Sequence, residues 1–334
     1  MKTKIFMTAT IIAASLITGC SFNKNPDYKI TVEPMVYNSA PAPGEMKKAV
    51  EVITKRLDHF FKIPAKNIIT ETGDGTITFT IHNIDTGIIF QVNRAITDNG
   101  RLEFYETWEN SEIIDCLMKA DSLLRDMQAG NAEATTGDEP AKDNPLLGIL
   151  YPMINNLGEP LPSCLAGLAK AGDTSQVNTY LEMDRIKELF PKDIRFFWSA
   201  NPYRYDPSLS LYELHAIKTD PVSEKAPLDG SVITSAEVVN NASDFDVRIG
   251  LSMDSEGAAA WSCITRKNTD RCIALVFDGN VISYPRVLTE IKGGNTEISG
   301  NFTLTEANDF VNILKSGQLP FKLKITETQV IKNN

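Results

Sequence analysis

Cys20 is the residue whose chemistry the sequence specifies most clearly. It ends the run LITGC at 16–20, which follows a basic start and an apolar stretch too short to span a bilayer. This arrangement is typical of a lipobox, in which the cysteine thiol takes a diacylglyceryl group before the leader is cleaved. We therefore expect a signal peptide at 1–19, lipidation of Cys20 and a polar tether at 20–27.

Four further cysteines remain, at Cys116, Cys164, Cys263 and Cys272. A secreted chain meets an oxidising compartment, and four cysteines allow three pairings. Cys263 and Cys272 flank a polar turn, so we predict them as a disulfide, with four separate buried thiols as the alternative. None lies in a C-x-x-C motif, which argues against a zinc knuckle or a thioredoxin-like site.

Catalytic residue types do not gather into a recognisable set. His59, His82 and His215 are scattered, and each is predicted to be solvated or locally hydrogen-bonded. The sequence has no H-E-x-x-H, Walker A or G-x-S-x-G motif. We therefore predict no enzyme activity, no metal and no cofactor. The net charge of −10 also disfavours nucleic acid as a partner.

One aromatic cluster has a residue composition that suits binding. It consists of Phe196, Phe197, Trp198, Tyr203 and Tyr205. In a strand, three consecutive aromatic residues would face both sides of a sheet. The cluster is then either part of a sheet buried on both faces, or an exposed apolar patch that holds extended polypeptide.

Hydrophobic periodicity predicts the elements that must position these residues. The chain has 334 residues, of which 42% are apolar and 23% are charged, as in an ordinary globular protein. Expected strands and helices alternate as strand 28–37, helix 44–62, strands 67–72 and 76–82, helix 88–96 and a strand from 102. This β-α-β-β-α-β order is typical of a ferredoxin-like unit. A helix at 111–128 and an irregular acidic loop at 129–144 follow.

The C-terminal third has the clearest local signals. A strand is expected at 245–253 and a helix from 255 to about 265. A hairpin is expected about Asp278-Gly279, because both residues tolerate the positive φ of a type I′ turn. Thr303 and Glu306 form a capping box before a helix that ends at Gly317, and a last strand follows at 321–330.

Five short motifs in this region occur in an order that resembles a known family. They are LDG at 228–230, DSEGA at 254–258, FDGNVISYP at 277–285, ISGNFT at 298–303 and LKSGQLP at 314–320. Together they resemble the periplasmic P1 domain of SecD and SecDF, the accessory subunit of the Sec protein-export channel. The resemblance implies an α+β fold, with a ferredoxin-like base at 28–108 and 301–331 and an inserted head at 109–300.

The resemblance also implies a function. In that family the domain is thought to hold the emerging preprotein, coupled to proton flow through transmembrane helices. We expect a lipid-anchored, periplasm-facing accessory protein that binds exported or unfolded polypeptide without proton coupling. Sec translocon subunits are candidate partners, and the anchor is the expected contact with the membrane. Ser21 favours the outer membrane over the inner one. The alternative is a repurposed SecD-like binding or scaffold lipoprotein with an unrelated ligand.

Overall fold

The computed structural model describes residues 25–35, 41–73, 75–132, 143–203, 210–239 and 247–331. The predicted signal peptide, Cys20 and most of the predicted tether lie outside these ranges, as does Tyr205. No helix in the described ranges combines the length and the apolar composition needed to cross a bilayer.

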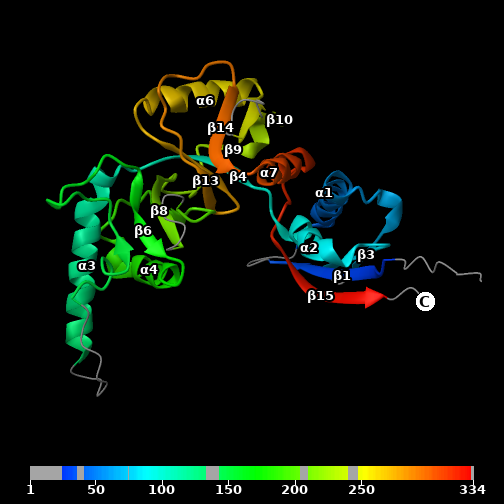
Figure 1. The fold of residues 1–334 in the computed structure, drawn as a ribbon, viewed down its shortest axis with the longest axis horizontal. Helices are drawn as coiled ribbons and strands as arrows, with labels where there is room; N and C mark the ends of the chain where they lie inside the picture. Colours follow the sequence, from blue (N-terminus) through cyan, green and yellow to red (C-terminus); the bar gives the residue numbers. More distant parts are fainter. Residues whose placement is uncertain are drawn as a thin grey trace, which may run out of the picture.

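The two ends of the described chain form one α+β domain, the base, on the right of Figure 1. Its sheet has the order β15-β1-β3-β2, and all of its neighbouring strands are antiparallel. With β15 as the fourth strand, this is the strand order of a ferredoxin-like fold, so the predicted fold class is confirmed. The base consists of β1 (Asp27–Pro34), α1 (Pro43–Phe61), β2 (Ile68–Gly73), β3 (Thr76–Ile81), α2 (Ile89–Thr97) and β15 (Leu323–Ile331).

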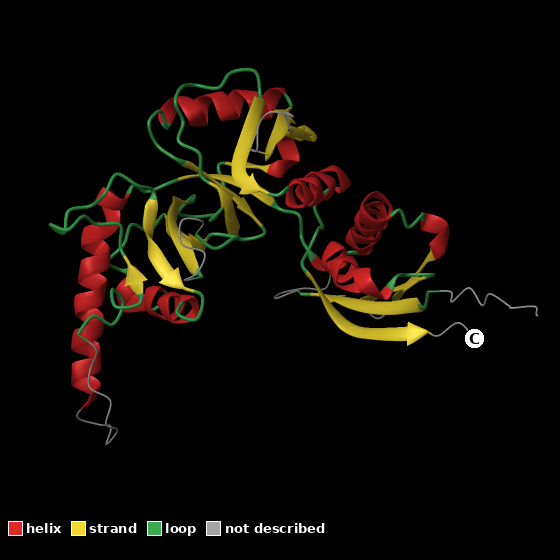
Figure 2. Ribbon diagram, viewed as in Figure 1, coloured by secondary structure: helices red, strands yellow, loops and turns green. Residues whose placement is uncertain are grey.

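Both helices of the base cover one face of this sheet (Figure 2). On β3, Ile77, Phe79 and Ile81 are fully buried, while the intervening threonines face the other side and are half-buried. Helix α1 begins where the backbone N–H of Ala42 donates to the Glu45 carboxylate (2.9 Å). Its apolar residues recur at helical spacing, so a single stripe of the helix packs on the sheet.

The predicted base boundaries are wrong at two elements. Strand β4 (Leu102–Glu106), predicted as the fourth strand of the base, instead pairs with β12 (Ile273–Phe277) in the head. The first four residues of β4 are all buried, which suits an inner strand, whereas most residues of β15 are exposed, which suits the edge position beside β1. Helix α7 (Leu304–Ser316) is shared between the two domains. Its Ala307, Phe310 and Val311 pack into the head core, whereas Ser316 lies beside His59 of α1.

Three sheets make up the inserted head. The central sheet, of order β13-β12-β4-β9, has the hydrophobic core of the β10-β11-β14 sheet, α6 and α7 on one face. On its other face a smaller cluster joins it to β8 of the β5-β6-β8-β7 sheet. The remaining elements of the head are α3 (Asn110–Ala132), β5 (Leu150–Tyr151), β6 (Leu165–Lys170), α4 (Thr174–Leu181), α5 (Asp184–Lys187), β7 (Ile194–Trp198), β8 (Leu211–Lys218), β9 (Leu228–Asp229), β10 (Ile233–Val239), β11 (Val247–Met253), α6 (Ser255–Lys267), β13 (Asn280–Ser283) and β14 (Asn295–Phe302).

Most of the helices and strands expected in the C-terminal third are present. The Asp278-Gly279 turn has positive φ at both residues, and the Thr303–Glu306 capping box forms as predicted. Helix α3 is longer than predicted and continues to Ala132, into the stretch expected to be a loop. Residues 133–142 of that predicted loop lie outside the described ranges.

The chain passes between base and head twice, first after α2 and again after α7. Arg56 of α1 donates hydrogen bonds to the backbone of both crossings. Its fully buried guanidinium donates to the carbonyl of Ala95 in α2 (3.1 Å) and to the carbonyls of Asp98 and Asn99 (3.2 Å) on the first crossing. It also donates to the carbonyl of Gly317 on the second crossing (3.0 Å). The two crossings bond directly as well, because the N–H of Leu319 donates to the carbonyl of Asn99 (2.9 Å).

Gly100 lies at this junction with φ +77°, and a Cβ atom there would come within 2.6 Å of the Arg56 guanidinium and 2.7 Å of Ile313. We therefore predict that Gly100→Ala lowers the free energy of unfolding by about 2 kcal/mol or more, through backbone strain and displacement of Arg56. Denaturant unfolding measures this. The control is Gly130→Ala in α3, where no atom lies within 4 Å and the change should be neutral or stabilising by up to about 1 kcal/mol. Equal effects of the two substitutions would contradict this role for Gly100.

The pairing of β1 with β15 predicts that the C-terminal strand stabilises the N-terminal one. Ending the chain after Pro320 removes β15 and leaves one edge of β1 without its partner. Amide hydrogen exchange should then show lost protection across Asp27–Pro34, while β11 and β14 in the head retain theirs. Unchanged protection of β1 would show that the base does not depend on its C-terminal strand.

Candidate functional site

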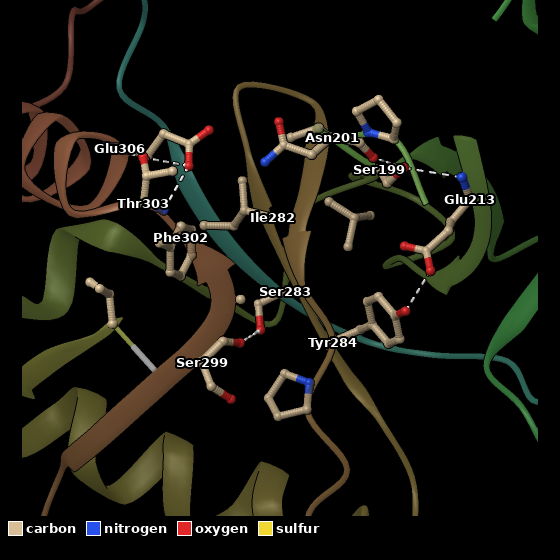
Figure 3. Close-up of a pocket in the computed structure, with 16 residues that line it drawn as sticks. Ser199, Asn201, Glu213, Ile282, Ser283, Tyr284, Ser299, Phe302, Thr303 and Glu306 are labelled. Carbon is tan, nitrogen blue, oxygen red and sulfur yellow. Dashed lines mark hydrogen bonds between the residues drawn. The ribbon is translucent and has the colours of Figure 1, made fainter. Parts of the chain in front are cut away.

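A groove of about 1150 Å³ lies in the head where the central sheet meets the ends of β7 and β14 (Figure 3). Its walls come from segments that are far apart in the sequence. The lining residues are Ser199–Pro202, Glu213, Val247, Val281–Pro285, Ser299, Gly300, Phe302, Thr303 and Glu306. None of these residues is lysine or arginine, so the ionisable groups that line the groove are two carboxyls and one tyrosine.

Strand β13 forms one wall and is the outermost strand of the central sheet. It follows the Asp278-Gly279 turn, whose Asp278 carboxylate accepts from the backbone N–H groups of Gly100 (3.0 Å) and Arg101 (2.8 Å). The junction with the base thus fixes the start of β13. An outermost strand leaves backbone donors and acceptors available to an extended chain.

A short segment of the protein already pairs with this edge. Ser199 forms a parallel bridge with Val281, and the N–H of Ala200 donates to the Val281 carbonyl (2.8 Å). Farther along, the Ser283 hydroxyl donates to the carbonyl of Ser299 on β14 (2.5 Å). Ser199 and Ala200 therefore already cover part of the β13 edge, and the groove runs beside it.

One end of the groove contains a hydrogen-bonded Glu213–Tyr284 pair. The Tyr284 hydroxyl donates to the Glu213 carboxylate (2.6 Å), and the Glu213 N–H donates to the Ser199 hydroxyl (3.0 Å). Burial, reinforced by the adjacent carboxylate, raises the pKa of Tyr284 above its ordinary value. Tyr284 therefore stays protonated near neutral pH and acts as a hydrogen-bond donor, not as a general base.

At the other end, Glu306 has a structural role. Its carboxylate accepts from the backbone N–H (2.8 Å) and the hydroxyl (2.9 Å) of Thr303, which closes the capping box of α7. The groove thus offers hydrogen-bonding groups and an apolar strand surface, and its acidic groups are already bonded within the protein. Among the described residues, no three His, Cys, Asp or Glu side chains lie together as metal ligands would.

Three residues of the predicted aromatic cluster, Phe196, Phe197 and Trp198, pack against hydrophobic cores of the head. Phe196 and Trp198 lie against the core around α3, and Phe196 is in edge contact with Phe190 (5.3 Å between ring centroids). Phe197 lies on the opposite face of β7, beside Tyr105 (5.9 Å between centroids). All three are half-buried, as is Tyr203. The interpretation of a sheet covered on both faces therefore fits the structure better.

All four of these cysteines, Cys116, Cys164, Cys263 and Cys272, are free in the structure, so the predicted Cys263–Cys272 disulfide is absent from it. Cys263 is half-buried on α6, whereas the buried Cys272 has Cys164 as its thiol neighbour. The sequence shows that Cys263 and Cys272 flank a turn. It does not indicate that the start of β12 lies beside the start of β6.

His215 also differs from the sequence-based expectation. His82 bonds locally, with Nδ1 2.7 Å from the Asp27 carboxylate, as expected. His215 is instead fully buried, and neither ring nitrogen has a hydrogen-bond partner among the described residues. Its ring lies 4.5 Å from that of Tyr284, next to the groove. Both faces of its strand, β8, are covered, which the sequence does not indicate.

Most of the groove-lining residues were missed from the sequence. The hairpin containing Asn280–Ser283 was predicted, and the motif FDGNVISYP includes much of the groove wall. The sequence could therefore have indicated this segment, but not that β13 is outermost in its sheet or that Ser199 and Ser299 approach it. Those two facts depend on contacts between residues that are distant in sequence.

Comparisons with known proteins agree with this architecture. Residues 211–321 match the family model of the SecDF P1 head subdomain. The SecD protein translocase subunit of Rhodothermus marinus is 27% identical over 337 residues, which cover 92% of this chain and 51% of the relative. SecD of Leptotrichia buccalis is 36% identical over 104 residues, which cover 31% of this chain and 26% of the relative. The chain thus spans at most about half the length of these relatives.

Two solved SecDF structures share the fold. A crystal structure of SecDF in a super-membrane-facing form has a TM-score of 0.52 at 17% identity, covering 92% of this chain and 30% of that one. A second, titled as a membrane component that enhances protein export, has a TM-score of 0.51 at 18% identity, covering 90% of this chain and 98% of that one. The predicted resemblance is therefore confirmed: the chain is similar to SecD, it shares the fold of the solved SecDF structures, and its residues 211–321 match the family model of the SecDF P1 head subdomain.

Proposed function

We propose that this protein is a lipid-anchored, periplasm-facing SecD-like accessory protein that holds extended polypeptide in the groove of its head. The observation that carries the proposal is a groove of about 1150 Å³ beside the outermost strand β13, a strand that lies in the part of the chain that matches the SecDF P1 head. Binding along a strand edge uses backbone hydrogen bonds, so it tolerates many client sequences. Exported and unfolded chains are the proposed clients.

The dimensions of the edge suit a short segment. Strand β13 has four residues, which correspond to about 13 Å of extended chain. A contact of this size, without a deep apolar pocket, supports an affinity of about micromolar, or roughly −8 kcal/mol, at best. Weak binding is compatible with a holding role, because a transport client must also be released. The proposal is passive and includes no proton-coupled step.

The groove supports binding in preference to catalysis. Glu306 caps a helix, Glu213 accepts from Tyr284, and Ser199 donates to the Asn201 carbonyl (2.8 Å). None of these groups forms a nucleophile–base pair of the kind that acyl or phosphoryl transfer requires. Holding a client needs only the donors, acceptors and strand edge that are present.

The proposed anchor is compatible with the geometry of the base. Seven peptide units separate Cys20 from Asp27, and a fully extended chain of that length spans at most about 25 Å. Asp27 pairs with Ile331 in the β1–β15 ladder, so both ends of the described chain lie at one edge of the base. An acylated Cys20 would hold that edge near the bilayer, with Sec channel subunits as candidate neighbours.

Filling the groove should weaken client binding without unfolding the protein. Asn201 lines the groove and its side chain is exposed, so we predict that Asn201→Trp reduces the affinity for a fluorescent unfolded secretory protein at least fivefold. Asn156→Trp is the matched control, because Asn156 is also exposed but does not line the groove. Fluorescence anisotropy gives the affinities, and a melting curve verifies folding. If the well-folded parent binds no unfolded secretory protein, client holding is wrong and a scaffold with an unrelated ligand replaces it.

The lipid anchor makes a separate prediction. Cys20→Ala removes the thiol that receives the diacylglyceryl group. The variant should therefore accumulate as unprocessed precursor or appear in the soluble periplasmic fraction. Cell fractionation and the mass of the mature N-terminus measure this, with Cys263→Ala as a control that keeps the lipobox. A Cys20→Ala protein that is processed and fractionates with membranes like the parent would overturn the anchor.

A further inference from the structure

Two buried, free cysteines from different sheets of the head have side chains that are hydrogen-bonded to each other. Cys164 precedes β6 and Cys272 precedes β12, and their exposed fractions are 2% and 5%. These strands belong to the β5-β6-β8-β7 sheet and the central sheet, respectively. The cysteines are 108 positions apart in the sequence, so only the tertiary fold brings them together.

The segment that follows β4 holds both cysteines in place. The Thr107 hydroxyl donates to the carbonyl of Cys272 (2.9 Å). Three residues later, the N–H of Asn110 donates to the carbonyl of Ser163 (2.7 Å), immediately before Cys164. Arg271, immediately before Cys272, donates to the carbonyl of Thr107 (3.0 Å) and to both carboxylate oxygens of Glu112 (2.6 and 3.2 Å). One short segment therefore fixes the backbone on both sides of the contact.

The two thiols are chemically unequal. A side-chain hydrogen bond from Cys164 lowers the pKa of Cys272, and the positive charges of Arg286 and Arg271 act in the same direction. The same hydrogen bond, together with burial, raises the pKa of Cys164. The thiolate is the nucleophile in disulfide exchange, so the lowered pKa favours Cys272 as the attacking thiol.

We propose that Cys164 and Cys272 form a disulfide that joins the two sheets of the head beside the groove. The oxidant is a disulfide, either a small molecule such as oxidised glutathione or a protein disulfide. The Cys272 thiolate attacks one of its sulfurs, forms a mixed disulfide and releases a thiolate. Deprotonated Cys164 then attacks the Cys272 sulfur and releases the second thiolate. The cysteine pair loses two protons and two electrons, and the oxidant becomes two thiols.

This cross-link would fix one wall of the groove. Cys272 forms an antiparallel backbone β-bridge with Arg286, and the N–H of Ile273 donates to the Pro285 carbonyl (3.1 Å). The segment after β13 is therefore hydrogen-bonded to the segment around Cys272. Cys164 is tied to the sheet that contains Glu213, since Leu165 pairs with His215 in the β6–β8 ladder. The disulfide would thereby restrain the Tyr284 wall relative to the Glu213 wall. In cells it depends on the oxidising, periplasm-facing location of the proposed function.

The test uses the purified full chain, equilibrated in native buffer with either oxidised glutathione or dithiothreitol. Free thiols are alkylated, the protein is digested, and linked peptides are identified by mass spectrometry. We expect a peptide pair joining residues 164 and 272, lighter by two hydrogen atoms than its reduced parts, in the oxidised sample alone. The melting temperature of the oxidised protein should be higher than that of the reduced protein by about 5 °C or more, because the bond closes a long loop. Cys164→Ser and Cys272→Ser should abolish this shift, and Cys263→Ser should retain it.

Two results would overturn the proposal. The first is the absence of a 164–272 linkage in folded, oxidised protein, with both residues recovered as alkylated thiols. The second is a linkage of Cys272 to Cys263 or Cys116 instead. Both readouts use the isolated protein without any client. A failure here therefore leaves polypeptide holding intact, and a failure to bind clients leaves the disulfide intact.

Discussion

The buried guanidinium of Arg56 is the interaction on which the arrangement of base and head depends. Four backbone carbonyls from both chain crossings surround it, and a flat guanidinium can serve several acceptors in a way that a lysine ammonium cannot. Burial lowers the pKa of Arg56 to about 10, while the nearby charges of Asp278 and Asp98 oppose that shift. The group remains protonated at neutral pH, and the carbonyls offset the cost of burying its charge.

The groove is linked to this junction through a short series of contacts. Arg56 fixes the carbonyls of Asp98 and Asn99, and the next two residues donate their N–H groups to Asp278. Asp278 starts the turn that leads into β13, the strand edge beside the groove. A change at the junction therefore alters the start of the proposed binding edge. The same junction orders β15, which completes the base sheet, so both domains depend on it.

Local sequence signals predicted most of the secondary structure and left the choice of strand partners open. The period of α1, the Asp278-Gly279 turn and the Thr303–Glu306 cap are local features, and all three are present as predicted. Strand β4 has the pattern expected of a fourth base strand, but its burial on both faces requires a central position in the head. The one-sided pattern of β15 suits the edge beside β1. Distinguishing them requires knowledge of which core each strand covers.

The candidate site was less predictable than the fold, for a physical reason. The aromatic run from Phe196 to Trp198 marks a strand with two covered faces, and composition alone does not distinguish that strand from an exposed patch. The groove instead begins one residue later, at Ser199, where polar residues pair with the edge of β13. Likewise, the neighbour of Cys272 is set by the packing of two sheets and not by spacing along the chain. Sites assembled from distant segments carry little local signal.

Photo-crosslinking in intact cells tests directly whether polypeptide in transit lies in this groove. A photoreactive amino acid is placed at residue 201 in the groove, and in a second strain at residue 156, which is also exposed but does not line the groove. We expect that position 201 alone crosslinks to newly exported chains of many different sequences, and that these products disappear when export is blocked. Equal crosslinking at the two positions, or products at 201 that are independent of export, would contradict it.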